Sequence, residues 1–244
     1  MQKYLLPVLN TLAFIAVIIV NYLANALPLF GRSTGEISDM VANLLTPAGY
    51  AFAIWSVIYL LTGIWVVLQW VPSWRERTHY KSVGLLFVLA SACNVTWLLL
   101  WHSLLFYVTL LVMALFLVTL IILYRRLRNN SSTLSLLPFS IYLGWISVAT
   151  IQNVAVVINT IYSAEPTSFD QMVAVIVLLV GTLISGYMLV KQGDRWYPIV
   201  FIWAYGAIGV KQSTYPFVSY SAWVLAALLV VLIVWHVFKK QRTS

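Results

Sequence analysis

The sequence predicts an all-α protein, a polytopic membrane helical bundle with eight transmembrane helices and both termini inside (N-in/C-in). Composition is the first observation, since 62% of the 244 residues are hydrophobic and 8% are charged, whereas soluble domains carry roughly a quarter charged residues. The second observation is that the apolar residues form long segments, and the third is that basic residues gather in alternate connections. We therefore expect an integral membrane protein, located in a bacterial cytoplasmic membrane.

The predicted spans follow from the rule that crossing a bilayer takes about 20 mostly apolar residues. The uncharged stretch 82–124 is too long for one span, so we expect two spans with a hairpin turn at 101–103. The small pairs Gly181/Ser185 and Thr182/Gly186 are typical of helix–helix packing in membranes. The other six spans are predicted at 4–26, 49–71, 134–162, 171–190, from 196 to either 211 or 217, and 220–238.

The segment 33–45, between the first two spans, differs from the spans in kind. Ser33 and Glu36 have the spacing of a capping box. On a helix, four apolar residues would then share one face, namely Ile37, Val41, Leu44 and Leu45. This pattern predicts a short amphipathic helix at the membrane surface, and an ordinary connecting loop is the alternative.

The distribution of charge supports this orientation. With the N-terminus inside, twelve of the fourteen basic residues fall in inside segments, and Arg32 and Lys211 fall outside. This is the pattern of the positive-inside rule. The net charge of +8 is then explained by topology and by contact with anionic membrane lipid, so no nucleic-acid partner is expected.

The sequence offers little that could support catalysis. Cys93 is the single cysteine, which excludes a disulfide framework or a CxxC pair. The three histidines lack a metal-ligand spacing, and no predicted span contains a carboxylate for acid–base chemistry. The pattern favours recognition over catalysis and leaves the question of an enzyme open.

Aromatic residues mark the candidate binding site. Phe52, Trp55 and Tyr59 recur at helical spacing and would form one stripe. With aromatic residues of two further spans, they could wall a pocket for a flat apolar ligand, and the alternative is that they are ordinary helix-packing residues. The further residues are Trp97, Tyr142 and Trp145.

Three polar residues could orient such a ligand. Asn94 and Asn153 lie within predicted spans, where lipid offers no hydrogen-bond partner, so each should bond to another helix, to the other asparagine or to the ligand. Lys211 would lie inside the bilayer if its span continued to 217, where it could meet a ligand carboxylate. If the span ended at 210, Lys211 would extend to the outer headgroups.

Three motifs on these spans carry a family resemblance. They read P-x-x-x-x-F-x-x-W-x-x-x-Y-x-x-x-G from Pro47, N-x-x-W from Asn94, and Y-L-x-W-x-S-x-A-T-x-x-N from Tyr142. Together they resemble the tryptophan-rich sensory protein/translocator protein family, TspO/MBR, over residues 4–162. The resemblance implies a TspO-like five-helix membrane domain at 1–162, and an additional three-helix membrane extension at 163–244 without a counterpart in the five-helix fold.

The resemblance also implies a function. Family members bind porphyrins, haem-related tetrapyrroles and sterols in a pocket under the loop between the first two helices, and they are often homodimers. Trp55 and Trp145 resemble the pocket tryptophans, Asn94 and Trp97 the family's Asn-Trp pair, and Ala149 its small residue. We therefore expect a bound porphyrin or haem-related tetrapyrrole, with no required cofactor, for sensing, sequestration or delivery. A permease for a small apolar solute and a light-dependent porphyrin-degrading enzyme are the alternatives.

Overall fold

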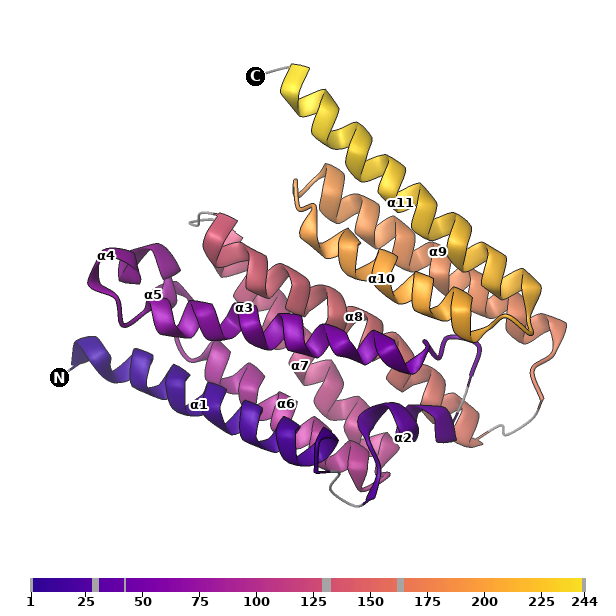
Figure 1. Ribbon diagram of the computed structural model, residues 1–244, viewed down its shortest axis with the longest axis horizontal. Coiled ribbons are helices and arrows are strands. Elements are labelled where there is room, and N and C mark those ends of the chain that lie inside the picture. The colour runs from indigo at the N-terminus through magenta and orange to yellow at the C-terminus, as the bar shows by residue number, and fades with distance from the viewer. Residues whose placement is uncertain (1, 28–30, 42, 129–132, 162–164, 243–244) are drawn as a thin grey trace. The chain divides into compact units, whose positions relative to one another are not determined.

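All regular elements in the described part of the chain are helices (Figure 1), which confirms the predicted all-α class. The computed structural model describes residues 2–27, 31–41, 43–128, 133–161 and 165–242. The chain forms two compact units. The first comprises Met1–Met40 and Phe52–Val157, and the second comprises Val41–Ala51 and Ile158–Ser244.

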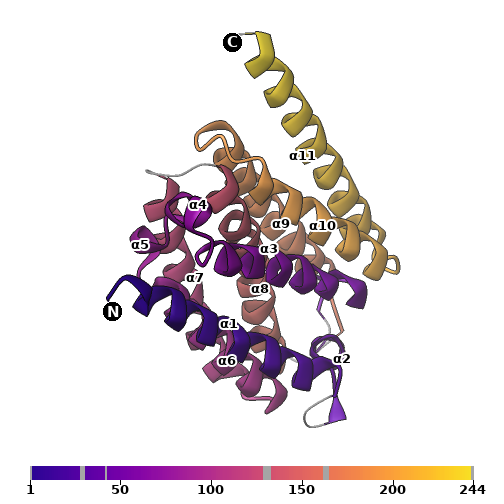
Figure 2. The ribbon, with the colours of Figure 1, turned by 60° about the vertical axis from the view of Figure 1, so that its left-hand side comes forward.

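Five long helices build the first unit. They are α1 (Gln2–Asn25), α3 (Ile54–Leu68), α6 (Leu86–His102), α7 (Phe106–Arg128) and α8 (Thr133–Ile161). Helix α1 packs against α6 and α3, and α6 packs against α7 (Figures 1 and 2). The hairpin turn predicted at 101–103 is confirmed, because α6 ends at His102 and α7 begins at Phe106. Residue 162, the predicted end of the fifth span, lies outside the described residues.

The uncharged stretch that starts at 82 does not begin as a straight helix, because α6 begins at Leu86. Short helical turns occupy the connection after α3, namely α4 (Pro72–Arg75), η3 (Glu76–Thr78) and α5 (Tyr80–Val83). The chain then bends by 70° before α6. Gly84 makes the bend, with φ 57° and ψ −132°, a conformation that glycine adopts without the steric penalty of a side chain.

The segment 33–45 contains a helix, but a shorter one than predicted. Helix α2 (Thr34–Met40) has seven residues, and the predicted capping box at its start is confirmed by mutual hydrogen bonds between Ser33 and Glu36. Beyond Met40 the chain turns, because Asn43 and Thr46 exchange hydrogen bonds of 3.0 Å. The segment is therefore a helix in its first part and a turn in its second, and its location at the membrane surface stays a prediction.

Three helices and the segment Val41–Ala51 build the second unit. Helices α9 (Ser168–Val190), α10 (Trp196–Lys211) and α11 (Pro216–Arg242) pack on one another. The segment lies along α10, since the Ala48 N–H donates to the Ala207 carbonyl and the Gln212 side chain donates to the Asn43 carbonyl, both at 3.0 Å.

Helix α10 stops at Lys211, so the interpretation in which its span continues to 217 is wrong. The backbone turns there, with the Tyr215 N–H donating to the Gln212 carbonyl at 2.8 Å. Pro216 then begins α11, at a helix start where proline's missing N–H does no harm.

The helices are those of a polytopic membrane protein. Among the described residues, six helices are long and apolar enough to cross a membrane, or seven if the bent pair before His102 forms one span. Helix α10, with 16 residues, falls short of that length. The count of eight spans and the N-in/C-in orientation therefore stay predictions.

Candidate ligand-binding site

Trp55, on the first turn of α3, is the centre of a set of interlocked rings. Its ring stacks on that of Tyr59 with centroids 5.5 Å apart. It also meets Trp97 of α6 at 6.4 Å, and Tyr142 and Trp145 of α8 at 5.9 and 6.2 Å. Phe52 completes the set by meeting Trp145 edge to face. We call these six residues the aromatic cluster.

Helical periodicity explains why these rings meet. Residues three and four apart lie on one helix face, which places Tyr142, Trp145, Ala149 and Asn153 along one side of α8. Phe52 precedes α3 on a 3-10 turn, η2 (Gly49–Ala53), and so stands one turn before Trp55. The structure thus brings together the predicted aromatic residues of three spans.

Asn94 joins three helices beside the cluster. Its carbonyl oxygen accepts a hydrogen bond of 3.0 Å from Asn21 of α1, and its amide donates to the Tyr142 hydroxyl at 3.1 Å. Asn94 is 1% exposed, so a side chain at this depth needs such partners. Sequence reasoning did not select Asn21, although a polar residue within an apolar span was the signal that selected Asn94.

Asn153 has a similar role but different partners. Its carbonyl oxygen accepts the indole N–H of Trp97 at 3.2 Å, and its amide donates to the Ala149 carbonyl at 3.0 Å. The two asparagines therefore bond to other groups rather than to each other. Each orients an aromatic side chain of the cluster.

One polar group of the cluster lacks a partner in the described part of the chain. The indole N–H of Trp145 is buried without a hydrogen bond, and Trp145 is 2% exposed. Leaving a buried polar group unpaired costs about 1–3 kcal/mol. Such groups call for a specific explanation, and a ligand that supplies the missing partners is one.

Helix α2 covers the end of α6 next to the cluster. The indole N–H of Trp101 donates to the Thr34 carbonyl at 3.3 Å, and the ring of Trp101 stacks on Trp97 at 5.5 Å. The Gln152 amide of α8 donates to the Ser38 hydroxyl at 3.5 Å. A movement of α2 would therefore reach the aromatic cluster through Trp101, a residue that the sequence did not single out.

Lys211 belongs to the second unit, whereas the other predicted site residues belong to the first. It is half-buried and is the last residue of α10. A meeting with a ligand carboxylate stays a prediction for this side chain.

Helix α2, which covers the end of α6, should loosen in acid. Hydrogen bonds from the Ser33 backbone and hydroxyl, with a smaller effect of the Arg32 charge, hold the pKa of Glu36 below its ordinary value of 4.5. A carboxylate with a lowered folded-state pKa stabilises the fold above its unfolded pKa and loses this effect as the pH falls through the folded value. We expect hydrogen exchange of the α2 amides to speed up below about pH 4.5 in wild type, relative to exchange of the α7 amides. A Glu36→Gln protein should show no such step, and an equal step in both proteins would contradict the prediction.

Long apolar helices around a buried aromatic cluster define a membrane protein with a candidate site for an apolar ligand. A comparison with protein families identifies it further: the family model described as TSPO-like protein matches residues 7–235. The chain belongs to this family, and the match includes the three helices after residue 162. No curated protein and no solved structure matches the chain.

Proposed function

We propose that this protein binds a hydrophobic, tetrapyrrole-like ligand in the aromatic cluster, for sensing, sequestration or delivery. Membership of the TSPO-like family supports ligand binding in a membrane. The observation that carries the proposal is the indole N–H of Trp145, buried among rings without an acceptor. A packing role explains the rings, but it does not explain a buried donor without a partner.

The cluster suits a flat ligand with a polar edge. Stacking between aromatic rings contributes about 0.5–1.5 kcal/mol per pair beyond burial. A carboxylate or carbonyl oxygen of the ligand would accept from the Trp145 N–H. Asn94 and Asn153 would act indirectly, because their hydrogen bonds already hold Tyr142 and Trp97 in place.

Binding requires the rings to separate, since they now meet one another. Trp55 and Phe52 both meet Trp145 edge to face, at 85° and 86°. Phe52 lies on a short 3-10 turn and is half-buried, so it can move with less disruption than a ring in the middle of α3. We expect the ligand to displace Phe52 and to exchange ring–ring contacts for stacking on Trp55 and Trp145.

A porphyrin titration followed by tryptophan fluorescence tests this proposal. Trp145→Phe keeps a ring but removes the donor, and Trp55→Phe reduces the stacking surface. Together they should remove roughly 2 kcal/mol of binding free energy, which corresponds to a rise in Kd of about 30-fold.

Trp235→Phe is the matched control, because this tryptophan is 54% exposed on α11 and distant in sequence from the cluster. It should bind porphyrin like wild type. Equal binding by the Trp55→Phe/Trp145→Phe protein would show that the ligand site lies elsewhere. Uptake of the ligand into proteoliposomes, or formation of a degradation product, would instead favour the permease or the enzyme.

A further inference from the structure

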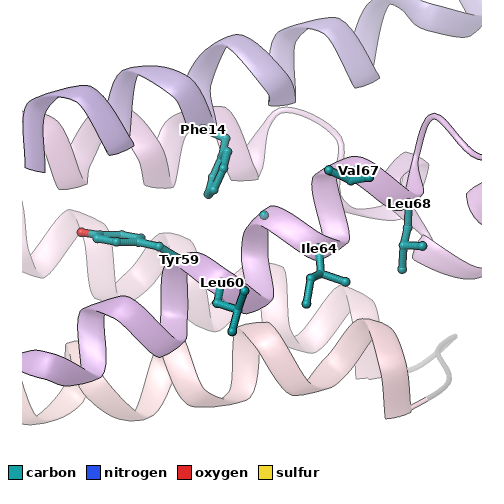
Figure 3. A pocket seen from close by; sticks show the side chains of 7 residues that line it. Phe14, Tyr59, Leu60, Ile64, Val67 and Leu68 are labelled. Atoms are coloured by element: carbon teal, nitrogen blue, oxygen red, sulfur yellow. The ribbon is translucent and has the colours of Figure 1, made fainter. Parts of the chain in front are cut away.

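An apolar groove runs between α1 and α3 on the first unit (Figure 3). It has a volume of about 340 Å³. Phe14 reaches into it from α1, and Leu60, Ile64 and Leu68 line up along α3. Leu60 and Val67 are 65% and 62% exposed, so on a membrane-spanning helix this groove opens toward lipid.

Gly63 forms the floor of the groove and allows the two helices to approach. A Cβ atom at this position would lie 2.9 Å from the Phe14 ring, closer than van der Waals contact. The groove extends from Leu68 to Tyr59, roughly 14 Å along α3 at 1.5 Å per residue. Its shape and its apolar wall fit a hydrocarbon chain that lies parallel to the helices.

Aromatic side chains lie beyond Leu68, the last residue that lines the groove, toward the N-terminus of α1. The indole N–H of Trp70 donates to the Thr11 hydroxyl at 3.0 Å. The rings of Tyr4 and Trp70 stack with centroids 6.2 Å apart. Tryptophan and tyrosine in this arrangement are typical of the headgroup level of a bilayer.

Arg75 lies beside these aromatic side chains, and no negative charge among the described residues is paired with it. Its guanidinium lies 4.9 Å from the centroid of the Tyr4 ring, and its Nε donates to the Gln69 carbonyl at 2.7 Å. No acceptor for its two terminal nitrogens and no carboxylate partner is present in the described ranges. The residue is 6% exposed, and a charge buried to this extent is normally paired.

We propose that an anionic phospholipid occupies this site, with its phosphate on Arg75 and one acyl chain in the α1–α3 groove. A role in capping the end of α3 accounts for the Nε hydrogen bond alone. A phosphate would use the terminal nitrogens, because the planar guanidinium forms bidentate bonds with phosphate oxygens. A membrane lipid supplies the phosphate and the hydrocarbon chain in one molecule, as the adjoining groove requires.

The predicted location of Arg75, on the cytoplasmic side of the membrane, agrees with an anionic phospholipid as the ligand. The connection that holds Arg75 also contains Arg77 and Lys81, which the positive-inside rule assigns to the cytoplasmic face, where anionic lipids are concentrated. The site differs from the aromatic cluster in position and chemistry, so the proposal does not depend on tetrapyrrole binding.

Native mass spectrometry of the delipidated protein tests the proposal. Phosphatidylglycerol and phosphatidylcholine with the same acyl chains are added in equal amounts. Both lipids carry the same phosphate, but the choline ammonium of phosphatidylcholine offsets its charge. Wild type should therefore retain one phosphatidylglycerol at least fivefold more often than phosphatidylcholine, which corresponds to about 1 kcal/mol. Arg75→Gln should lose this preference, because it removes the charge but can still donate to the Gln69 carbonyl.

Two controls separate this site from general charge effects. Arg77→Gln removes an equal charge from the same connection, at a residue that lies over the Trp74 ring, and it should keep the preference. Arg75→Lys should keep part of it, and retains the charge in case Arg75→Gln fails to fold. Equal retention by wild type and Arg75→Gln, or equal loss in Arg77→Gln, would overturn the proposal. So would displacement of the lipid by glycerol phosphate at equal concentration, since a headgroup alone does not occupy the groove.

Discussion

Replacing Trp55 by alanine is expected to lower the free energy of unfolding of the first unit by about 3 kcal/mol. Trp55 meets four other rings within 6.4 Å and is 9% exposed. Its removal would leave a cavity among neighbours on three helices that cannot collapse together. Lipid-facing residues contribute little to the free energy of unfolding, because the acyl chains around them are as apolar as their side chains.

Thermal unfolding in a mild detergent measures this loss. Trp235→Ala is the control, as the same side chain is removed from a position that is 54% exposed, and its effect should stay within about 0.5 kcal/mol. A similar loss in both proteins would show that detergent contact, rather than the aromatic cluster, governs the result. Trp55→Phe should lie between wild type and Trp55→Ala, which separates the stability of the cluster from its proposed ligand.

Local sequence signals predicted the helices well and their interruptions poorly. The hairpin after His102 and the capping box at Ser33 follow from residues adjacent in the chain, and both are present. The bend at Gly84 is different, because a glycine between apolar residues is compatible with a continuous helix. The end of α10 depends on turn geometry beyond Lys211, which hydrophobicity alone does not reveal.

In the candidate site, too, some features could be predicted from the local sequence and others could not. Helical spacing places Trp55 beside Tyr59 and Tyr142 beside Trp145, so the stripes were predictable. The partners of Asn94 were not, because Asn21 is 73 residues away in sequence and its selection depends on how α1 crosses α6. Whether aromatic rings surround a hollow or contact one another also depends on side-chain packing, and in this structure the rings meet.

The second large loss of stability is expected from a substitution in the three C-terminal helices, at the crossing of α9 and α10. Gly181 is buried there, and a Cβ atom on it would lie 2.8 Å from Cε1 of the Phe201 ring and closer still to the Tyr205 hydroxyl. Phe201 and Tyr205 are 1% and 3% exposed, and the Tyr205 hydroxyl is fixed by a hydrogen bond of 2.6 Å to the Leu178 carbonyl. Neither ring can move aside, so Gly181→Val should lower the free energy of unfolding of the second unit by about 3 kcal/mol.

Gly186 offers a matched control on the same helix. It belongs to the other predicted small-residue pair. Apart from the adjoining backbone of α9, no atom of the described residues lies within 4 Å of where a Cβ would lie, so the predicted close packing is absent at this residue and present at Gly181. Gly186→Val should leave the thermal midpoint nearly unchanged, since valine tolerates a helix interior better than glycine does. Equal destabilisation by the two substitutions would mean that valine destabilises α9 at any position, whether or not another helix lies close by. A loss confined to Gly181→Val would show that close contact with α10 holds these helices together, as expected where lipid provides no hydrophobic driving force.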